Sequence, residues 1–107
     1  MKELELTTKE AVNYLKENVK IHDKLEISYN RMFAEGEILN MDFSEYFEKP
    51  GFKILMSLDE SDLGAAIEID VYEFEEDIIE FIHYPKDGEA VEVTVIWLQS
   101  IHVFKRY

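Results

Sequence analysis

Three carboxylates on one short predicted loop have the residue types and spacing that suit metal chemistry. Asp59, Glu60 and Asp62 lie between two segments that alternate like strands. Calcium and magnesium bind several carboxylate oxygens on a turn, and added negative charge raises their affinity. The alternative is a turn whose acids form local hydrogen bonds and keep the surface hydrated. A divalent cation, calcium or magnesium, is therefore the one cofactor that the sequence suggests.

Acidic residues continue well beyond this loop. Residues 59–92 hold thirteen acids and one base, Lys86, while the whole chain has 24 acids, 11 bases and a net charge of −13. A field of this sign attracts basic surfaces and repels nucleic acid and anionic membranes. The alternatives are a face that docks a basic protein, or a hydrated face partly neutralised by bases elsewhere in the fold. The predicted partner-binding residues are Glu68, Asp70, Glu73, Glu80 and Glu92.

The sequence gives little support for catalysis, and we expect a protein that is not an enzyme and has no catalytic residues. His22, His83 and His102 are scattered, and His83 stands beside Ile82 and Tyr84 on a predicted strand, where a histidine is usually packed or exposed. The serines lack the glycines of a nucleophile elbow, and no glycine-rich phosphate loop is present. An enzyme would need a pocket that gathers a histidine with acids distant in the sequence.

Composition limits the remaining classes. The chain has 107 residues, of which 47% are hydrophobic, which favours one folded domain over residues 1–107. It has no cysteine, so disulfides, thiolate nucleophiles and cysteine-based zinc sites are excluded. No apolar run is long enough for a membrane helix, and residues 1–5 do not resemble a secretory signal. We expect a cytoplasmic protein, a monomer or a dimer, with no nucleic-acid or membrane partner.

One helix and several strands are predicted to position these residues. Thr7 and Glu10 form the pattern of a capping box, and apolar residues follow at helical spacing, which predicts a helix over about 7–19. Alternation from Leu25 to Tyr29, with a turn at Asn30-Arg31, predicts a hairpin whose second arm reaches about Phe43. Gly36 is expected to allow a bulge or bend in that arm, and residues 42–48 a short helical turn.

The later half of the chain reads as strands joined by tight turns. Alternation predicts strands over 52–58, from Ala65 to about Val71, and over 78–84 after a turn at 75–77. Pro85 to Gly88 is a strong turn signal before a strand from Val91 to Trp97, and 101–104 is a possible last strand. The predicted class is α+β: an N-terminal helix followed by an antiparallel sheet of six or seven strands. The sheet is expected either to curl and pack on the helix or to form a small, partly open barrel.

The opening of the chain resembles a known group of proteins. Residues 17–20 (ENVK), residues 23–31 (DKLEISYNR) and a second strand around Gly36 are similar to uncharacterised small proteins of methanogenic archaea. This resemblance implies a cytoplasmic archaeal protein and assigns no functional residue.

Overall fold

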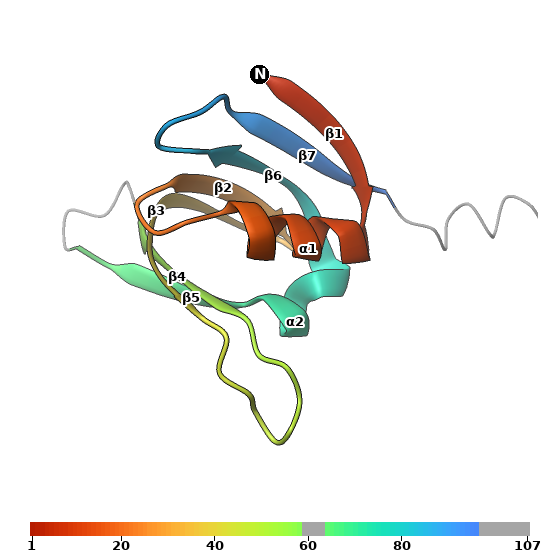
Figure 1. Cartoon of the computed structure of the whole chain (residues 1–107), viewed down its shortest axis with the longest axis vertical. Helices are drawn as coiled ribbons and strands as arrows, with labels where there is room; N and C mark the ends of the chain where they lie inside the picture. Colours follow the sequence, from red (N-terminus) through yellow and green to blue (C-terminus); the bar gives the residue numbers. More distant parts are fainter. Residues whose placement is uncertain (59–63, 97–107) are drawn as a thin grey trace, which may run out of the picture.

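Seven strands form one open sheet that curves around a helix in the computed structural model, which describes residues 1–58 and 64–96 (Figure 1). The strand order is β1-β7-β6-β2-β3-β4-β5, so that β1 and β5 are its two edges. The elements are β1 (Lys2–Thr7), α1 (Thr8–Asn18), β2 (Lys24–Tyr29), β3 (Met32–Asp42), β4 (Lys53–Leu58), β5 (Ala66–Asp70), α2 (Val71–Phe74), a 3₁₀ turn (Glu75–Asp77), β6 (Ile78–Tyr84) and β7 (Val91–Ile96).

A strand precedes the first helix, which overturns part of the predicted class. Leu4 and Leu6 of β1 pair in parallel register with Val93 and Val95 of β7. The sheet is therefore mixed, and because the two helices are short, the fold is mainly β. The predictions of an N-terminal helix, a purely antiparallel sheet and an α+β class are wrong, whereas the number of strands is confirmed. Parallel pairing joins segments that are far apart in the sequence, so no local turn signal predicts it.

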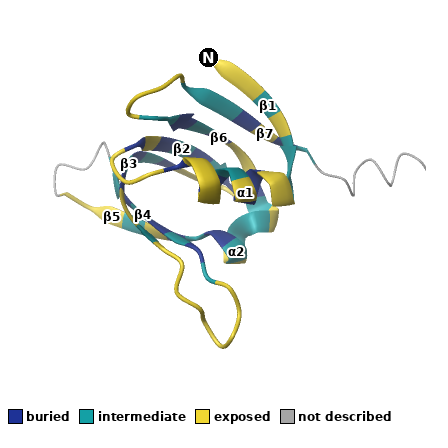
Figure 2. Cartoon of the chain, in the orientation of Figure 1, coloured by how far each residue is buried: buried dark blue, intermediate teal, exposed yellow. Residues whose placement is uncertain are grey.

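The helix itself forms for the predicted reason. The Thr7 hydroxyl accepts a hydrogen bond from the Glu10 amide at 3.2 Å, and the Glu10 carboxylate accepts one from the Thr7 amide at 2.9 Å. These two bonds satisfy amides that a helix start leaves without partners. The helix then lies across the concave face of the sheet and buries Ala11, Val12 and Leu15 against it (Figure 2).

The predicted hairpins are confirmed, with two local corrections. Asn30 has a φ of 54° in the β2–β3 turn, and the strand over 78–84 follows the turn at 75–77. The bulge in β3 lies between Ile38 and Asn40 and not at Gly36. Gly36 instead lets two strands approach closely, because an added Cβ would overlap the carbonyl oxygen of Ser57.

Residues 43–48 form a loop after the end of β3 at Asp42, so the helical turn predicted over 42–48 is wrong. The Asp42 carboxylate accepts a hydrogen bond from the Ser44 amide at 2.8 Å, which holds an Asx turn. Tyr46 and Lys49 then form a β-bridge around Phe47 and Glu48, both of which have positive φ. The predicted strand over 101–104 lies outside the described residues.

The two faces of the sheet differ in chemistry. The concave face carries the buried core from β2, β3, β4, β5, β6 and β7. The convex face carries the alternate, mostly polar residues of the same strands, as expected when one face is solvated. One polar residue, His83 of β6, takes a core-facing position and is only 2% exposed. His83 lies at the end of the concave face, where β6 pairs with the start of β7.

Candidate functional site

A pocket of 490 Å³ opens at the end of the concave face, near the C-terminal end of α1. Here α1 ends at Asn18, beside the last core-facing row of β1, β7 and β6. In that row Lys2 pairs with Val91, and Val91 pairs with His83. The lining residues are Lys2, Leu4, Tyr14, Asn18, Lys20, Ile21, Asp23, His83, Pro85, Lys86, Asp87 and Val91.

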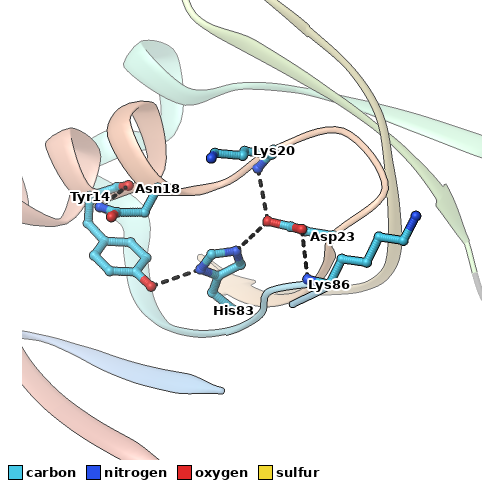
Figure 3. Close-up of polar contacts among 6 residues, drawn as sticks. All are labelled: Tyr14, Asn18, Lys20, Asp23, His83 and Lys86. Carbon is cyan, nitrogen blue, oxygen red and sulfur yellow. Dashed lines mark hydrogen bonds and ion pairs between the residues drawn. The ribbon is translucent and has the colours of Figure 1, made fainter. Parts of the chain in front are cut away.

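Three side chains from different elements form a hydrogen-bonded chain along one wall of this pocket (Figure 3). The Nε2 atom of His83 lies 2.7 Å from the Asp23 carboxylate, and the Nδ1 atom of His83 lies 2.8 Å from the Tyr14 hydroxyl. Tyr14 comes from α1, Asp23 from the α1–β2 loop and His83 from β6. We call Asp23, His83 and Tyr14 the relay.

The carboxylate of Asp23 is the fixed end of the relay. Its side chain is 7% exposed, and it accepts backbone hydrogen bonds from the amides of Lys86 and Lys20, each at 3.0 Å. Burial alone would raise the pKa of Asp23, but hydrogen bonds from His83, Lys86 and Lys20, together with the charge of His83, outweigh it and lower the pKa. The carboxylate is therefore ionised at neutral pH.

An ionised Asp23 determines the hydrogen positions of the whole relay. A carboxylate only accepts hydrogen bonds, so the Nε2 atom of His83 carries a hydrogen and donates it. The Nδ1 atom of a neutral His83 is then an acceptor, and the Tyr14 hydroxyl donates to it. Burial, with a contribution from the charge of Asp23, raises the pKa of Tyr14, so this phenol keeps its proton at neutral pH.

The pocket collects bases in an otherwise acidic protein. Three of the eleven basic side chains, Lys2, Lys20 and Lys86, line it. Lys2 occupies a core-facing position of β1 in line with Leu4 and Leu6, where alternation would place an apolar residue. The Lys20 side chain extends toward the end of α1 on the side of Asn18, whereas the ammonium group of Lys86 is turned away from His83 (Figure 3). Asp23 and Asp87 are the two acids of the lining, and the Asp23 carboxylate accepts hydrogen bonds from His83 and from two backbone amides.

The predicted partner-binding acids lie in three places. Glu68 is on the edge strand β5, 3.9 Å from Lys53. Asp70 ends that strand and caps α2 by accepting from the amide of Glu73, which is exposed on α2. Glu80 and Glu92 lie on β6 and β7, near the β1 edge of the sheet, which is opposite the β5 edge. The structure thus separates Glu68, Asp70 and Glu73 from the other two.

A different row of acids crosses the convex face. Glu3 pairs with Glu92, Glu92 with Ile82, Ile82 with Glu26, and Glu26 with Glu35, which places four glutamates in one register across five strands. We call Glu3, Glu26, Glu35 and Glu92 the glutamate row. Tyr84 donates a hydrogen bond to Glu26 at 3.1 Å. Its pKa is raised, first by burial, then by this bond and by the charges of Glu26, Glu35 and Glu92.

The predicted metal ligands Asp59, Glu60 and Asp62 lie outside the described residues, so their prediction stays a prediction. Within residues 1–58 and 64–96, no group of three or more histidines, aspartates and glutamates is placed to hold a metal ion. Over the same residues, no helix is long and apolar enough to cross a membrane.

Sequence reasoning named neither Tyr14 nor Asp23, and it assigned His83 to packing or to the surface. The available signal was the position of His83 in line with Phe81, since a histidine on the core-facing side of a strand needs a buried partner. The sequence separations of the two bonds are 60 and 69 residues, so the partners themselves were not readable. The gathered histidine and distant acid are the arrangement that an enzyme or a ligand site would require.

Comparisons with known proteins agree with the archaeal resemblance of the opening residues. No curated protein and no solved structure matches the chain. A family model described as an uncharacterised protein conserved in archaea matches residues 2–94, which include every strand and helix of the structure except the end of β7. The chain therefore belongs to this family of uncharacterised proteins conserved in archaea.

Proposed function

We propose that this protein binds a small molecule in the pocket beside the relay. The observation that carries the proposal is a hydrogen-bonded Asp23–His83–Tyr14 chain, with Asp23 and His83 buried and Tyr14 partly buried, that lines a cavity of 490 Å³. Cavities of roughly 300–1,000 Å³, with apolar walls and a few fixed polar groups, are typical of small-molecule sites. Leu4, Ile21 and Val91 supply apolar wall here.

The composition of the relay favours binding over catalysis. A relay that activates a nucleophile ends in a group whose oxygen or sulfur is easily deprotonated. Tyr14 ends this relay, and burial raises its pKa, so its hydroxyl is a poor nucleophile near neutral pH and a good hydrogen-bond donor. The role that suits such a group is to orient a bound molecule.

A ligand screen followed by NMR tests this function. Anionic, neutral and cationic metabolites are added to the ¹⁵N-labelled protein, and we expect at least one to shift the amide signals around Asn18, Lys20 and Lys86 in a saturable way. The change Ile21→Trp narrows the pocket and should abolish these shifts. Ile79→Trp is the matched control, because Ile21 and Ile79 are both 46% exposed and Ile79 does not line the pocket. No pocket shift across the screen would refute the function.

A second candidate function uses the opposite face. We propose that the glutamate row docks a basic protein surface, because like charges on neighbouring strands oppose folding and a basic partner would relieve that repulsion. Each exposed pair would contribute only about 0–1 kcal/mol, so charge would mainly speed encounter and exclude wrong partners. Glu80 lies next to this row on β6 and extends the same surface.

Association kinetics with a basic partner test the second function. Changing Glu26 and Glu92 to Gln should slow association and flatten its dependence on salt. Glu17→Gln, on the exposed side of α1, removes a charge far from the row and should change neither. Equal salt dependence in all three proteins would reject the glutamate row as a docking surface.

A further inference from the structure

We propose that the ligand of this pocket is a small anion, a carboxylate or a tetrahedral oxyanion, and that its binding takes up one proton at His83. The proposal rests on the proposed small-molecule function and adds the ligand's charge and the protonation change. Two independent features of the site carry it: the lysines of the lining and the hydrogen positions of the relay.

The lysines define the sign of the ligand. Lys2 occupies a core-facing position of β1, and Lys20 follows the end of α1, where its side chain lies on the side of Asn18; both residues line the pocket. The protein carries a net charge of −13, so an anion is repelled by most of its surface and gains attraction only where bases gather. The lining holds three lysines, Lys2, Lys20 and Lys86, against two acids, Asp23 and Asp87, so its formal charge is +1 while His83 is neutral.

The relay decides whether Tyr14 can donate to that anion. While His83 is neutral, the single hydroxyl hydrogen of Tyr14 is used by the Nδ1 atom of His83, and the pocket meets the oxygen lone pairs of the phenol. Lone pairs repel an anion. When solvent supplies a proton to Nδ1, His83 donates to the Tyr14 oxygen, and the hydroxyl hydrogen turns to the anion. One proton moves from solvent to His83, and no covalent bond of the ligand changes.

Charged groups on every side of His83 bear on this protonation. Asp23, on the loop before β2, accepts from Nε2 and stabilises the imidazolium. The lysines oppose it until an anion neutralises them, and Asp87 favours it. The titratable and charged residues that line the pocket around His83 are Tyr14 of α1, Asp23 and Lys20 of the α1–β2 loop, Lys2 of β1, and Lys86 and Asp87 of the β6–β7 turn. Binding of an anion and binding of a proton therefore favour each other.

Titration with sulfate and with acetate, at constant ionic strength and at about pH 6 and about pH 8, tests the coupling. Neither probe changes its own charge in this range. We expect saturable shifts of the His83 ring nitrogens and of the Lys20 amide, with an apparent Kd that is clearly higher at about pH 8 than at about pH 6. Calorimetry in two buffers of different ionisation enthalpy should show uptake of about one proton at the higher pH. The stronger of the two probes identifies the oxyanion or the carboxylate class.

Three variants separate the parts of the proposal. Tyr14→Phe keeps Asp23 and His83 and should weaken binding about tenfold near pH 6, the effect of losing one hydrogen bond to a charged group. His83→Gln should remove the pH dependence. Lys2→Gln should weaken binding at both pH values, whereas Lys9→Gln, an exposed lysine of α1 outside the pocket, should not.

The outcomes also separate this inference from the function on which it rests. If neither anion binds while a neutral or cationic molecule shifts the pocket signals, the anion proposal fails and the proposed function stands. If anions bind with equal affinity at both pH values, the proton coupling is wrong. If no molecule of any charge shifts the pocket, both fail. If His83→Gln does not fold, the pH dependence of anion affinity is measured in wild type and in Tyr14→Phe, and these two proteins decide whether the proton coupling is correct.

Discussion

Replacing Asp23 by asparagine should destabilise the protein by about 3 kcal/mol at neutral pH. The carboxylate accepts three hydrogen bonds from N–H groups on both of its oxygens: Oδ1 from the Lys86 amide, Oδ2 from the Lys20 amide and from His83. An asparagine has one accepting oxygen, so its NH₂ group must face at least one backbone N–H in a buried setting. Whichever way the amide turns, one buried donor is left without an acceptor.

The magnitude follows from these contacts. An unsatisfied buried donor costs about 1–3 kcal/mol, and each remaining bond loses the added strength of a charged acceptor. The neighbouring pocket lets water reach part of the site, which keeps the total near about 3 kcal/mol and below the sum of three broken bonds. For a domain of this size the melting temperature should fall by about 12 °C. Asp87→Asn, an exposed acid of the same pocket, is the matched control and should change stability by less than about 0.5 kcal/mol.

Urea unfolding of the three proteins at neutral and acid pH measures the effect. The pKa of Asp23 is lower in the folded protein than in the unfolded chain, so its stabilisation is present above the unfolded value and is lost as the pH falls through the folded value. The gap between wild type and Asp23→Asn should therefore narrow below about pH 4. A variant within about 0.5 kcal/mol of wild type at pH 7, with an unchanged m value, would refute the geometry assigned to Asp23.

Three further predictions concern the fold and the untested metal site. Thr7→Ala removes one half of the capping box and should lower the free energy of unfolding by about 1 kcal/mol, as measured by thermal melting; no loss would contradict the cap. Gly36→Ala should lower the free energy of unfolding by more than about 2 kcal/mol, because the added Cβ overlaps Ser57. Gly88→Ala should lower it far less, because there an added Cβ meets only Pro85 at 3.4 Å. Similar melting temperatures of the two variants would contradict the close approach of β3 and β4. If the loop with Asp59, Glu60 and Asp62 binds calcium or magnesium, either ion at about a hundred times its Kd should add about 2.7 kcal/mol relative to EDTA at matched ionic strength, and Asp59→Asn with Asp62→Asn should abolish the gain; equal melting in all three conditions removes the metal hypothesis.

Local signals predicted those parts of the fold whose causes are local. The capping box of Thr7 and Glu10, the turn after Tyr29 and the turn after Tyr84 each depend on residues within a few positions, and each is present as predicted. The β1–β7 pairing was missed because Leu4 and Leu6 gain their partners from the other end of the described chain. Charge counting found the acids but not their arrangement, since register across five strands decides which glutamates become neighbours.

The pocket shows the same limit more strongly. Its lining comes from β1, α1, the α1–β2 loop, β6 and the β6–β7 turn, so no single stretch of sequence holds its pattern. The sequence pattern can show that a histidine occupies the core-facing side of a strand, but it cannot show which residues are its hydrogen-bond partners. His83 could have been named as a residue in need of a buried acid, while Asp23 is one of 24 candidates.

The parallel pairing of β1 with β7 has a consequence for synthesis on the ribosome. Lys2 and Leu4 are made long before the residues around Val91 with which they pair. The β1 segment therefore has no strand to join until β7 has been made, and contacts between such distant segments form slowly. Because Lys2 and Leu4 also line the pocket, a nascent chain that lacks β7 has an incomplete pocket wall, and the proposed ligand should bind only after β1 has paired with β7.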